Sequence, residues 1–128
     1  MRHWLQLIQE IAEDIFQELG SGFSEAIYQK AFEVALRERQ IEYEEQRKVP
    51  IFFHGYFVGE AIPDLIVRDN GQAVVVIELK AVQNIGDKEV KQVKKYMETL
   101  KIPVGVVVNF PTSTAVDHPQ MIEVSLNS

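Results

Sequence analysis

Three side chains capable of metal-dependent chemistry stand close together in the middle of the chain: Asp64, Glu78 and Lys80. Asp64 follows Pro63 and opens a short strand-like run, whereas Glu78 and Lys80 close a second such run. Side chains alternate faces along a strand, so Glu78 and Lys80 point the same way and Leu79 points opposite. Two carboxylates and an ammonium on one patch can bind a divalent cation and stabilise phosphodiester cleavage.

The connection between the two runs decides whether the carboxylates meet. Residues 68–72 contain Asn70-Gly71, a strong signal for a two-residue hairpin turn. The register set by such a turn alone would place Asp64 and Glu78 on opposite faces of the sheet. Direct opposition requires a register that differs by one residue. The proposed chemistry therefore predicts a bulge, or an odd-length loop centred on Gly71.

Helical periodicity indicates three helices that could support this hairpin. The first covers residues 4–19 and ends at Gly20, the second covers residues 24–39, and the third covers residues 87–101. The expected core stripes are Ile27, Ala31, Val34 and Ala35 in the second helix, and Val90, Val93, Met97 and Leu100 in the third.

Strand-like runs occupy most of the remaining chain. We expect strands over residues 49–53, 56–58, 62–67, 73–79 and 104–109, with a short edge strand over 121–125. The connection from 73–79 through the third helix to 104–109 should be parallel and right-handed. Residues 1–128 are thus predicted to form a single α/β domain, a mixed β-sheet flanked by α-helices. The aromatic residues Tyr43, Phe52, Phe53, Tyr56 and Phe57 are interpreted as strand packing rather than a base-stacking platform.

Composition excludes several classes of function. The 128-residue chain has no cysteine, so disulfides, thiolate catalysis and cysteine-ligated metals are excluded. Its three histidines are scattered and support neither a histidine metal site nor a catalytic triad. The longest apolar run is too short to span a bilayer, and the first residues lack a signal-peptide core. A cytoplasmic location is therefore expected.

Charge is unevenly distributed along the chain. The net charge of −6 argues against broad nucleic-acid affinity, which normally rests on a basic surface. Residues 1–47 carry 5 basic and 10 acidic groups, whereas residues 87–101 carry 5 basic and 3 acidic groups. The third helix is therefore locally basic.

Several short motifs occur in order along the chain: Gly22-Phe23-Ser24-Glu25-Ala26-Ile27-Tyr28, Pro63-Asp64, Glu78-Leu79-Lys80, Gln92-Val93-Lys94-Lys95-Tyr96 and Asn109-Phe110. In these motifs, over about residues 15–111, the chain resembles the PD-(D/E)xK nuclease superfamily. Within it, the chain is similar to the small bacterial and archaeal group named for its GxxExxY motif, although Pro111 stands where that group has glycine. The resemblance implies a restriction-endonuclease-like fold and a Mg²⁺-dependent nuclease site.

Asp64 and Glu78, with the backbone carbonyl of Leu79, are the predicted ligands of one or two Mg²⁺ ions. Oxygen ligands suit this hard cation, and Mn²⁺ could replace it. Lys80 is predicted to stabilise charge on the phosphate or to help activate water. The alternative for Glu78 and Lys80 is a surface ion pair at an exposed strand end.

Glu25 and Tyr28 enter the candidate site through the resemblance. Glu25 is expected to be a further metal ligand or to orient a water molecule in catalysis, and Tyr28, on the same helix face, to help bind substrate. The alternative for Glu25 is structural, because an acid in the first helical turn is favoured by the helix dipole.

Gln92 and Tyr96 form an i,i+4 pair beside the core stripe of the third helix. We expect them to position the active-site lysine or the phosphate, with Lys88 and Lys95 contacting the nucleic-acid backbone. The alternative is a boundary pair that covers the edge of the core.

Two classes of function remain open. A metal-dependent nuclease, with DNA favoured over RNA as its substrate, is the leading hypothesis. A non-catalytic module that binds nucleic acid or protein on a nuclease-derived fold is the alternative, and the acidic net charge favours it. The wide apolar arc of the first helix also predicts a homodimer.

Overall fold

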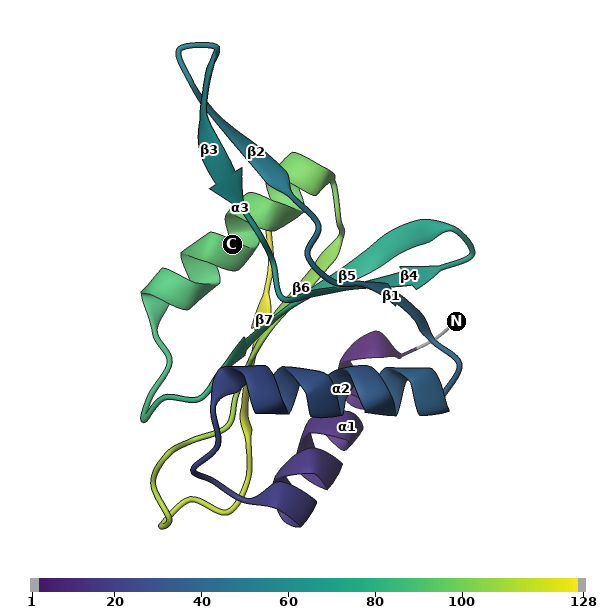
Figure 1. Ribbon diagram of the computed structural model, residues 1–128, viewed down its shortest axis with the longest axis vertical. Coiled ribbons are helices and arrows are strands. Elements are labelled where there is room, and N and C mark those ends of the chain that lie inside the picture. The colour runs from purple at the N-terminus through teal and green to yellow at the C-terminus, as the bar shows by residue number, and fades with distance from the viewer. Residues whose placement is uncertain (1–2, 127–128) are drawn as a thin grey trace.

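The computed structural model describes residues 3–126 as a mixed sheet between helices, with one hairpin projecting from it (Figure 1). The helices are α1 (Trp4–Leu19), α2 (Glu25–Glu38) and α3 (Asp87–Leu100). The strands are β1 (Glu42–Glu44), β2 (Val49–Phe53), β3 (Tyr56–Ala61), β4 (Leu65–Asp69), β5 (Gln72–Lys80), β6 (Val104–Asn109) and β7 (Gln120–Val124). The five-stranded sheet has the order β1-β4-β5-β6-β7, and β2 pairs only with β3. The predicted mixed sheet flanked by helices is confirmed.

Helices cover both faces of the central strand β5. Val75, Ile77 and Leu79 pack in one core cluster with residues of α1 and α2. Val76 belongs to a second cluster with Val93 and other residues of α3. Because side chains alternate along β5, Glu78 and Lys80 lie on the α3 face of the sheet.

The β4–β5 hairpin contains both the Asn-Gly turn and the predicted bulge. Asn70 and Gly71 have φ angles of 52° and 79°, the left-handed values that a two-residue hairpin turn needs. The register then shifts between Val67 and Arg68, which leaves one extra residue in β5. Beyond the shift, Leu65 pairs with Ile77. The prediction of a bulge is confirmed, and the register places Asp64 across from Glu78.

The β5–α3–β6 crossover is confirmed as a parallel connection, with Lys80 level with Asn109. Helix α3 packs closely on β6 at Gly105. A Cβ atom on Gly105 would lie 2.5 Å from Sδ of Met97 and 2.6 Å from Cγ1 of Val93. A glycine in this strand therefore lets the helix approach the sheet.

The predicted core stripe of α2 is partly wrong. Ile27 and Val34 are each 45% exposed, whereas Ala35 is buried as expected. The buried face is formed instead by Tyr28, Phe32, Glu33, Ala35 and Leu36. The larger side chains on the neighbouring stripe fill the space under the sheet, so the helix is rotated relative to the prediction.

The apolar arc of α1 is covered within the chain. Its buried residues are Ile8, Ile11, Ala12, Ile15 and Phe16. Trp4, Leu5 and Leu7 pack against the same core and are partly buried. The exposed apolar excess on which the dimer prediction depended is therefore not found on α1, and the dimer stays a prediction. Among residues 3–126, no helix has the length and apolar character needed to cross a bilayer.

The β2–β3 hairpin contradicts the interpretation of its aromatic residues as strand packing. Val49 is buried and Ala61 packs beside it at the base of the hairpin. Phe52, Phe53, Tyr56 and Phe57 are instead large exposed side chains. The two strands pair only with each other, and the tip of their hairpin projects away from the helices and the central sheet, so no second layer covers these residues (Figure 1).

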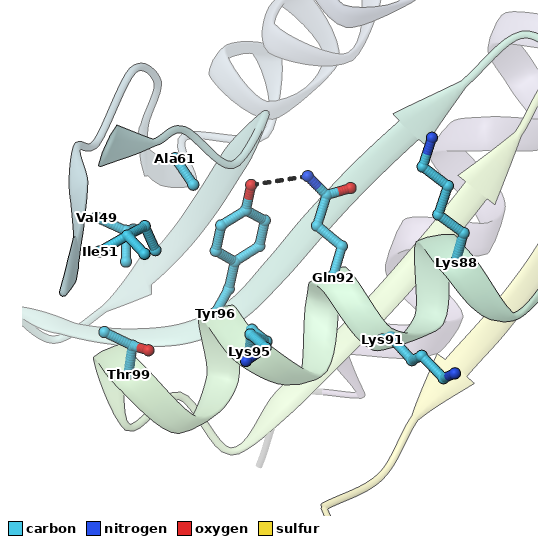
Figure 2. A pocket seen from close by; sticks show the side chains of 9 residues that line it. All are labelled: Val49, Ile51, Ala61, Lys88, Lys91, Gln92, Lys95, Tyr96 and Thr99. Atoms are coloured by element: carbon cyan, nitrogen blue, oxygen red, sulfur yellow. Dashed lines mark hydrogen bonds between the residues drawn. The ribbon is translucent and has the colours of Figure 1, made fainter. Parts of the chain in front are cut away.

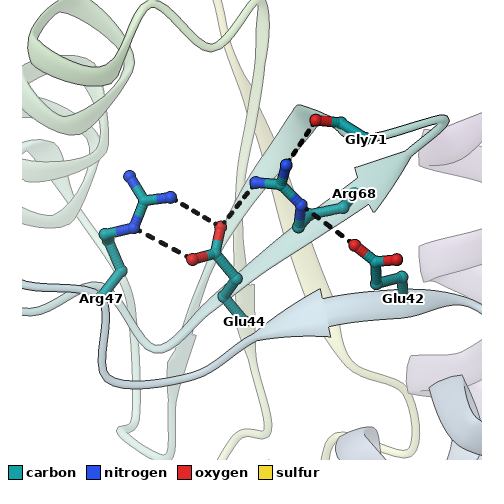
Figure 3. Close-up of polar contacts among 5 residues, drawn as sticks. All are labelled: Glu42, Glu44, Arg47, Arg68 and Gly71. Atoms are coloured by element: carbon teal, nitrogen blue, oxygen red, sulfur yellow. Dashed lines mark hydrogen bonds and ion pairs between the residues drawn. The ribbon is translucent and has the colours of Figure 1, made fainter.

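The short strand β1, which was not predicted from the sequence, adds a polar edge to the sheet (Figure 3). Arg68 of β4 donates hydrogen bonds to Glu42 at 3.1 Å and to Glu44 at 2.9 Å. Arg47 bonds the same Glu44 carboxylate at 2.9 and 3.0 Å. These ion pairs hold a three-residue strand whose sequence, Glu-Tyr-Glu, carries little apolar signal.

Candidate active site

Asp64 and Glu78 are held together by reciprocal hydrogen bonds to backbone amides. The Asp64 N–H donates to Oε1 of Glu78 at 3.2 Å, and the Leu79 N–H donates to Oδ2 of Asp64 at 2.7 Å. Asp64 lies immediately before β4, and Glu78 lies near the end of β5. The bulged hairpin therefore brings the two carboxylates to one end of the sheet on the α3 side.

Glu78 is a buried acid with an altered proton affinity. Only 5% of the residue is exposed. Burial, and then the charge of Asp64, raises its pKa from 4.5 to about 7, although the Asp64 N–H and Lys80 oppose this shift. Holding two carboxylates ionised here is therefore costly without a positive charge close by.

Asp64, Glu25 and Lys80 complete this electrostatic cluster. Burial raises the pKa of Asp64, the Leu79 N–H lowers it, Glu25 raises it and Lys80 lowers it. Glu25 and Lys80 act in the same directions on Glu78. The structure thus brings within electrostatic range the four residues predicted to act in catalysis, although three of them lie on the β4–β5 hairpin and Glu25 begins α2.

Gln29 is a supporting residue that the sequence reading missed. Its Nε2 donates to the backbone carbonyl of Asp64 at 3.2 Å and to Oε2 of Glu33 at 3.3 Å. Gln29 lies one helical turn after Glu25, and this i,i+4 spacing was the signal that could have revealed it. The bond fixes the start of α2 against the strand end that carries Asp64.

Gln92 and Tyr96 approach the site from α3. Nε2 of Gln92 donates to the Tyr96 hydroxyl at 3.1 Å, so the i,i+4 spacing brings the two side chains into contact (Figure 2). Burial, and then the charges of Glu78 and Asp64, raises the pKa of Tyr96, whereas the bond from Gln92 lowers it. Tyr96 therefore lies within electrostatic range of both carboxylates. Lys88 and Lys95 line the same groove as Tyr96 and Gln92.

A sequence model of the PD-(D/E)XK nuclease superfamily matches residues 2–121. The chain belongs to this superfamily. The match confirms the restriction-endonuclease-like fold predicted from the sequence. Pro63-Asp64 and Glu78-Leu79-Lys80 stand in the order that the superfamily name describes, just before β4 and at the end of the adjacent strand β5. A search of curated proteins found no match.

A solved structure described as the crystal structure of SSO0001 has a similar fold. The TM-score is 0.56 and the sequence identity is 22%, over 78% of this chain and 50% of that chain. The PD-(D/E)XK chain thus spans about half the length of the SSO0001 chain that it matches. At this identity the likeness extends to the fold alone.

Tyr28 has a structural role in this PD-(D/E)XK protein. The residue is fully buried, and its ring stacks on Phe110 with centroids 4.3 Å apart. Its hydroxyl donates to the Gly20 carbonyl at 2.5 Å and accepts the Phe23 N–H at 3.4 Å. This burial does not support the predicted contact of Tyr28 with substrate. The tyrosine instead closes the loop that leads to Glu25.

Asn109 supports the other side of the site. The residue is fully buried at the end of β6. Its Oδ1 accepts the Val82 N–H at 3.0 Å, and its Nδ2 donates to the Val82 carbonyl at 2.9 Å and to Oε1 of Gln120 at 2.8 Å. The Asn-Phe motif thus fixes the chain directly after Lys80, and Phe110 packs against Tyr28.

The donor set fits an oxygen-seeking divalent cation, although residues 3–126 contain no ready-made group of three or more metal-binding side chains. The described hydrogen bonds use Oδ2 of Asp64 and Oε1 of Glu78, which leaves the other oxygen of each carboxylate available to bind a metal ion. The Lys80 carbonyl accepts the Phe110 N–H at 2.9 Å, so backbone alternation directs the Leu79 carbonyl away from β6. These are the oxygen ligands that Mg²⁺ and Mn²⁺ accept.

Proposed function

We propose that this protein is a Mg²⁺-dependent nuclease that hydrolyses phosphodiester bonds of nucleic acid. The observation that carries the proposal is the reciprocal bonding of Asp64 and Glu78, with Lys80 on the same face of the sheet. Glu78 is buried, and the neighbouring charge of Asp64 raises its pKa further, so the ionised pair is costly to keep together. A bound cation offsets that cost, and membership of the PD-(D/E)XK superfamily supports nucleic acid as the substrate.

Each residue then has a distinct task. Asp64, Glu78 and the Leu79 carbonyl hold the cation, which supplies charge neutralisation at the phosphate and acidifies water. The Lys80 ammonium stabilises the negative charge that develops on the phosphate in the transition state. Glu25, exposed at the start of α2, acts as a further ligand or orients the attacking water.

Tyr96 and Gln92 position the reacting groups from the opposite side of the site. Their mutual hydrogen bond fixes the Tyr96 hydroxyl, whose pKa already responds to both carboxylates. Lys88 and Lys95, which line the same groove from α3, contact phosphates of the substrate. The order Gly22, Glu25, Tyr28 supports placing the chain in the GxxExxY group of the superfamily. A cytoplasmic location and DNA as the favoured substrate belong to the same proposal.

A direct assay tests the proposal. Purified protein is incubated with labelled single-stranded, duplex and branched DNA and RNA, in Mg²⁺, Mn²⁺ or EDTA. We expect cleavage that requires the divalent ion and is lost in Asp64→Asn and Glu78→Gln. Asp69→Asn is the matched control, because Asp69 lies at the other end of β4. It should cleave like the wild type.

The same assay addresses the non-catalytic alternative. Binding of nucleic acid without cleavage under any metal would favour a binding module on this fold. Cleavage that persists in EDTA, or in both carboxylate variants, would contradict the assignment of the metal ligands.

A further inference from the structure

The β2–β3 hairpin projects from the body of the molecule (Figure 1), and its aromatic side chains are exposed. Four aromatic residues flank its turn, Phe52 and Phe53 before it and Tyr56 and Phe57 after it, and their exposed fractions range from 58% to 76%. So many exposed apolar side chains close together are unusual on a globular domain, and they indicate a surface that binds a ligand or another macromolecule.

Both faces of the hairpin tip carry aromatic rings. Phe52 pairs with Phe57 and Phe53 pairs with Tyr56, and neighbouring pairs point to opposite faces. The Phe52 and Phe57 rings are 6.1 Å apart in an edge-to-face arrangement, and Phe53 stacks on His54 at 3.9 Å. A hairpin that packed on a core would need only one apolar face. Rings on both faces suit a ligand that is itself made of flat rings.

A basic groove begins where this hairpin meets α3 (Figure 2). It has a volume of about 270 Å³, and Val49, Ile51 and Ala61 form its hairpin side. The α3 side carries Lys88, Lys91 and Lys95, and no acidic residue lines the groove. These three lysines provide a local positive charge on a chain whose net charge is −6.

The groove and the candidate active site approach each other at Tyr96. Tyr96 lines the groove and packs in the same core cluster as Val76, which lies two residues before Glu78 on the same face of β5. The Gln92 side chain, bonded to the Tyr96 hydroxyl, lies between Lys88 and Tyr96 along the helix (Figure 2). A phosphate backbone that follows the lysines past Tyr96 would therefore be directed toward the carboxylates.

We propose that the β2–β3 hairpin and this groove together bind an unpaired strand of nucleic acid. Bases stack on the exposed rings of the hairpin, while phosphates follow Lys88, Lys91 and Lys95 toward Asp64 and Glu78. Exposed aromatic rings beside a basic groove are the common means of holding single strands, because every unpaired base offers a face for stacking. In a duplex those faces are already occupied. The inference rests on the proposed function in taking nucleic acid as the ligand, and it specifies the substrate class.

The first test uses the wild-type protein in EDTA, so that binding is measured without cleavage. Fluorescence anisotropy compares oligo(dT) and oligo(rU) of about 20 nucleotides with a blunt DNA duplex of the same length. We expect the better-bound single strand to have an affinity at least about tenfold above that of the duplex. Equal or tighter binding of the duplex would overturn the proposal.

The second test separates the rings from the lysines. Phe52→Ala/Phe57→Ala and Phe53→Ala/Tyr56→Ala should each weaken single-strand binding about tenfold and leave duplex binding unchanged. Lys88→Ala/Lys91→Ala/Lys95→Ala should weaken binding of both and reduce the salt slope for single strands by about two. Val34→Ala and Lys30→Ala, exposed on α2, are matched controls and should bind like the wild type.

The outcomes distinguish this inference from the proposed catalysis. If nothing is cleaved but the single-strand preference disappears with the rings, catalysis fails and the inference stands. If nucleic acid is cleaved but the aromatic variants bind like the wild type, the inference fails and catalysis stands. If the aromatic variants only convert a dimer to a monomer in light scattering, the hairpin is an interface between copies, and the inference is overturned.

Discussion

Two hairpins follow each other along this chain, and they differ in burial: one lies within the central sheet and the other is exposed to solvent. The β2–β3 and β4–β5 hairpins each have a two-residue turn ending in glycine, His54-Gly55 and Asn70-Gly71. Each also contains a register shift. The β4–β5 hairpin lies within the five-stranded sheet, which helices cover on both faces, whereas β2–β3 forms a separate two-stranded sheet.

The difference shows what each hairpin is suited to do. Helices α1, α2 and α3 cover the aliphatic side chains on both faces of β5, so Glu78 near its end is buried. Aromatic side chains on both faces of β2–β3 stay in contact with solvent. The bulge in β4–β5 aligns Glu78 with Asp64, which suits a site that holds reacting groups in place. The exposed aromatic side chains of β2–β3 suit a surface that binds a ligand.

The largest expected effect is in the buried hairpin. Asp64→Asn and Glu78→Gln should each abolish cleavage. Each should also abolish the rise in melting temperature that millimolar Mg²⁺ or Mn²⁺ causes in the wild type, because a ligand that binds only the native state stabilises it. The metal-free variants should be as stable as the wild type or more so, since a repulsion is removed. Thermal melts with and without EDTA measure this. An equal metal response in wild type and both variants would contradict the ligand assignment.

The raised pKa of Glu78 predicts a pH dependence of stability without metal. Unfolded Glu78 ionises near 4.5, but the folded protein holds the proton up to about 7. The folded state is therefore favoured at low pH, and its free energy of unfolding should fall by about 3 kcal/mol between about pH 4 and about pH 8. Urea denaturation in EDTA across this range measures the loss.

Glu78→Gln cannot ionise and should lose most of this pH dependence. Glu123→Gln, an exposed acid on β7, is the matched control and should retain it. A pH profile of Glu78→Gln that matches the wild type would show that Glu78 does not carry the effect.

Lys80→Ala tests the catalytic assignment within the same hairpin. The lysine is proposed to act on charge that develops only in the transition state, so cleavage should fall at least about 10²-fold while metal binding stays nearly intact. Single-turnover cleavage and the metal-dependent melting shift measure the two properties separately. Lys101→Ala, at the far end of α3, controls for the loss of a positive charge. A joint loss of metal binding and cleavage would instead make Lys80 a structural partner of the carboxylates.

The sequence predicted the buried hairpin far better than the projecting one. In β4–β5, the requirement that Asp64 meet Glu78 conflicted with the Asn70-Gly71 turn, and this conflict predicted the bulge that the structure contains. In β2–β3, strand-forming aromatics beside a turn give the same local pattern whether or not another layer covers them. Burial is decided by elements distant in sequence, so local periodicity could not reveal that Phe52 and Phe57 are exposed.

The supporting contacts of the site were also beyond the reach of the sequence. The residues proposed to carry the chemistry could be named because acids and a lysine at strand ends have a recognisable pattern. The roles of Tyr28, Gln29 and Asn109 depend on hydrogen bonds to backbone groups of Gly20, Asp64 and Val82, which only the fold brings near. For this reason the sequence could not reveal that Tyr28, which was predicted to contact substrate, is buried.

The smallest expected effect is in the projecting hairpin. Phe57→Ala should change the free energy of unfolding by less than about 0.5 kcal/mol, because the ring is mostly in solvent and leaves no cavity when removed. Ile77→Ala, a fully buried change in β5, should cost about 3 kcal/mol as the comparison. Urea denaturation of the two variants measures both values. A cost for Phe57 that approached the cost for Ile77 would mean that the β2–β3 aromatics stabilise the fold. The contrast between the two hairpins would then fail, because the aromatic rings would be kept for folding and their exposure would no longer indicate a bound strand.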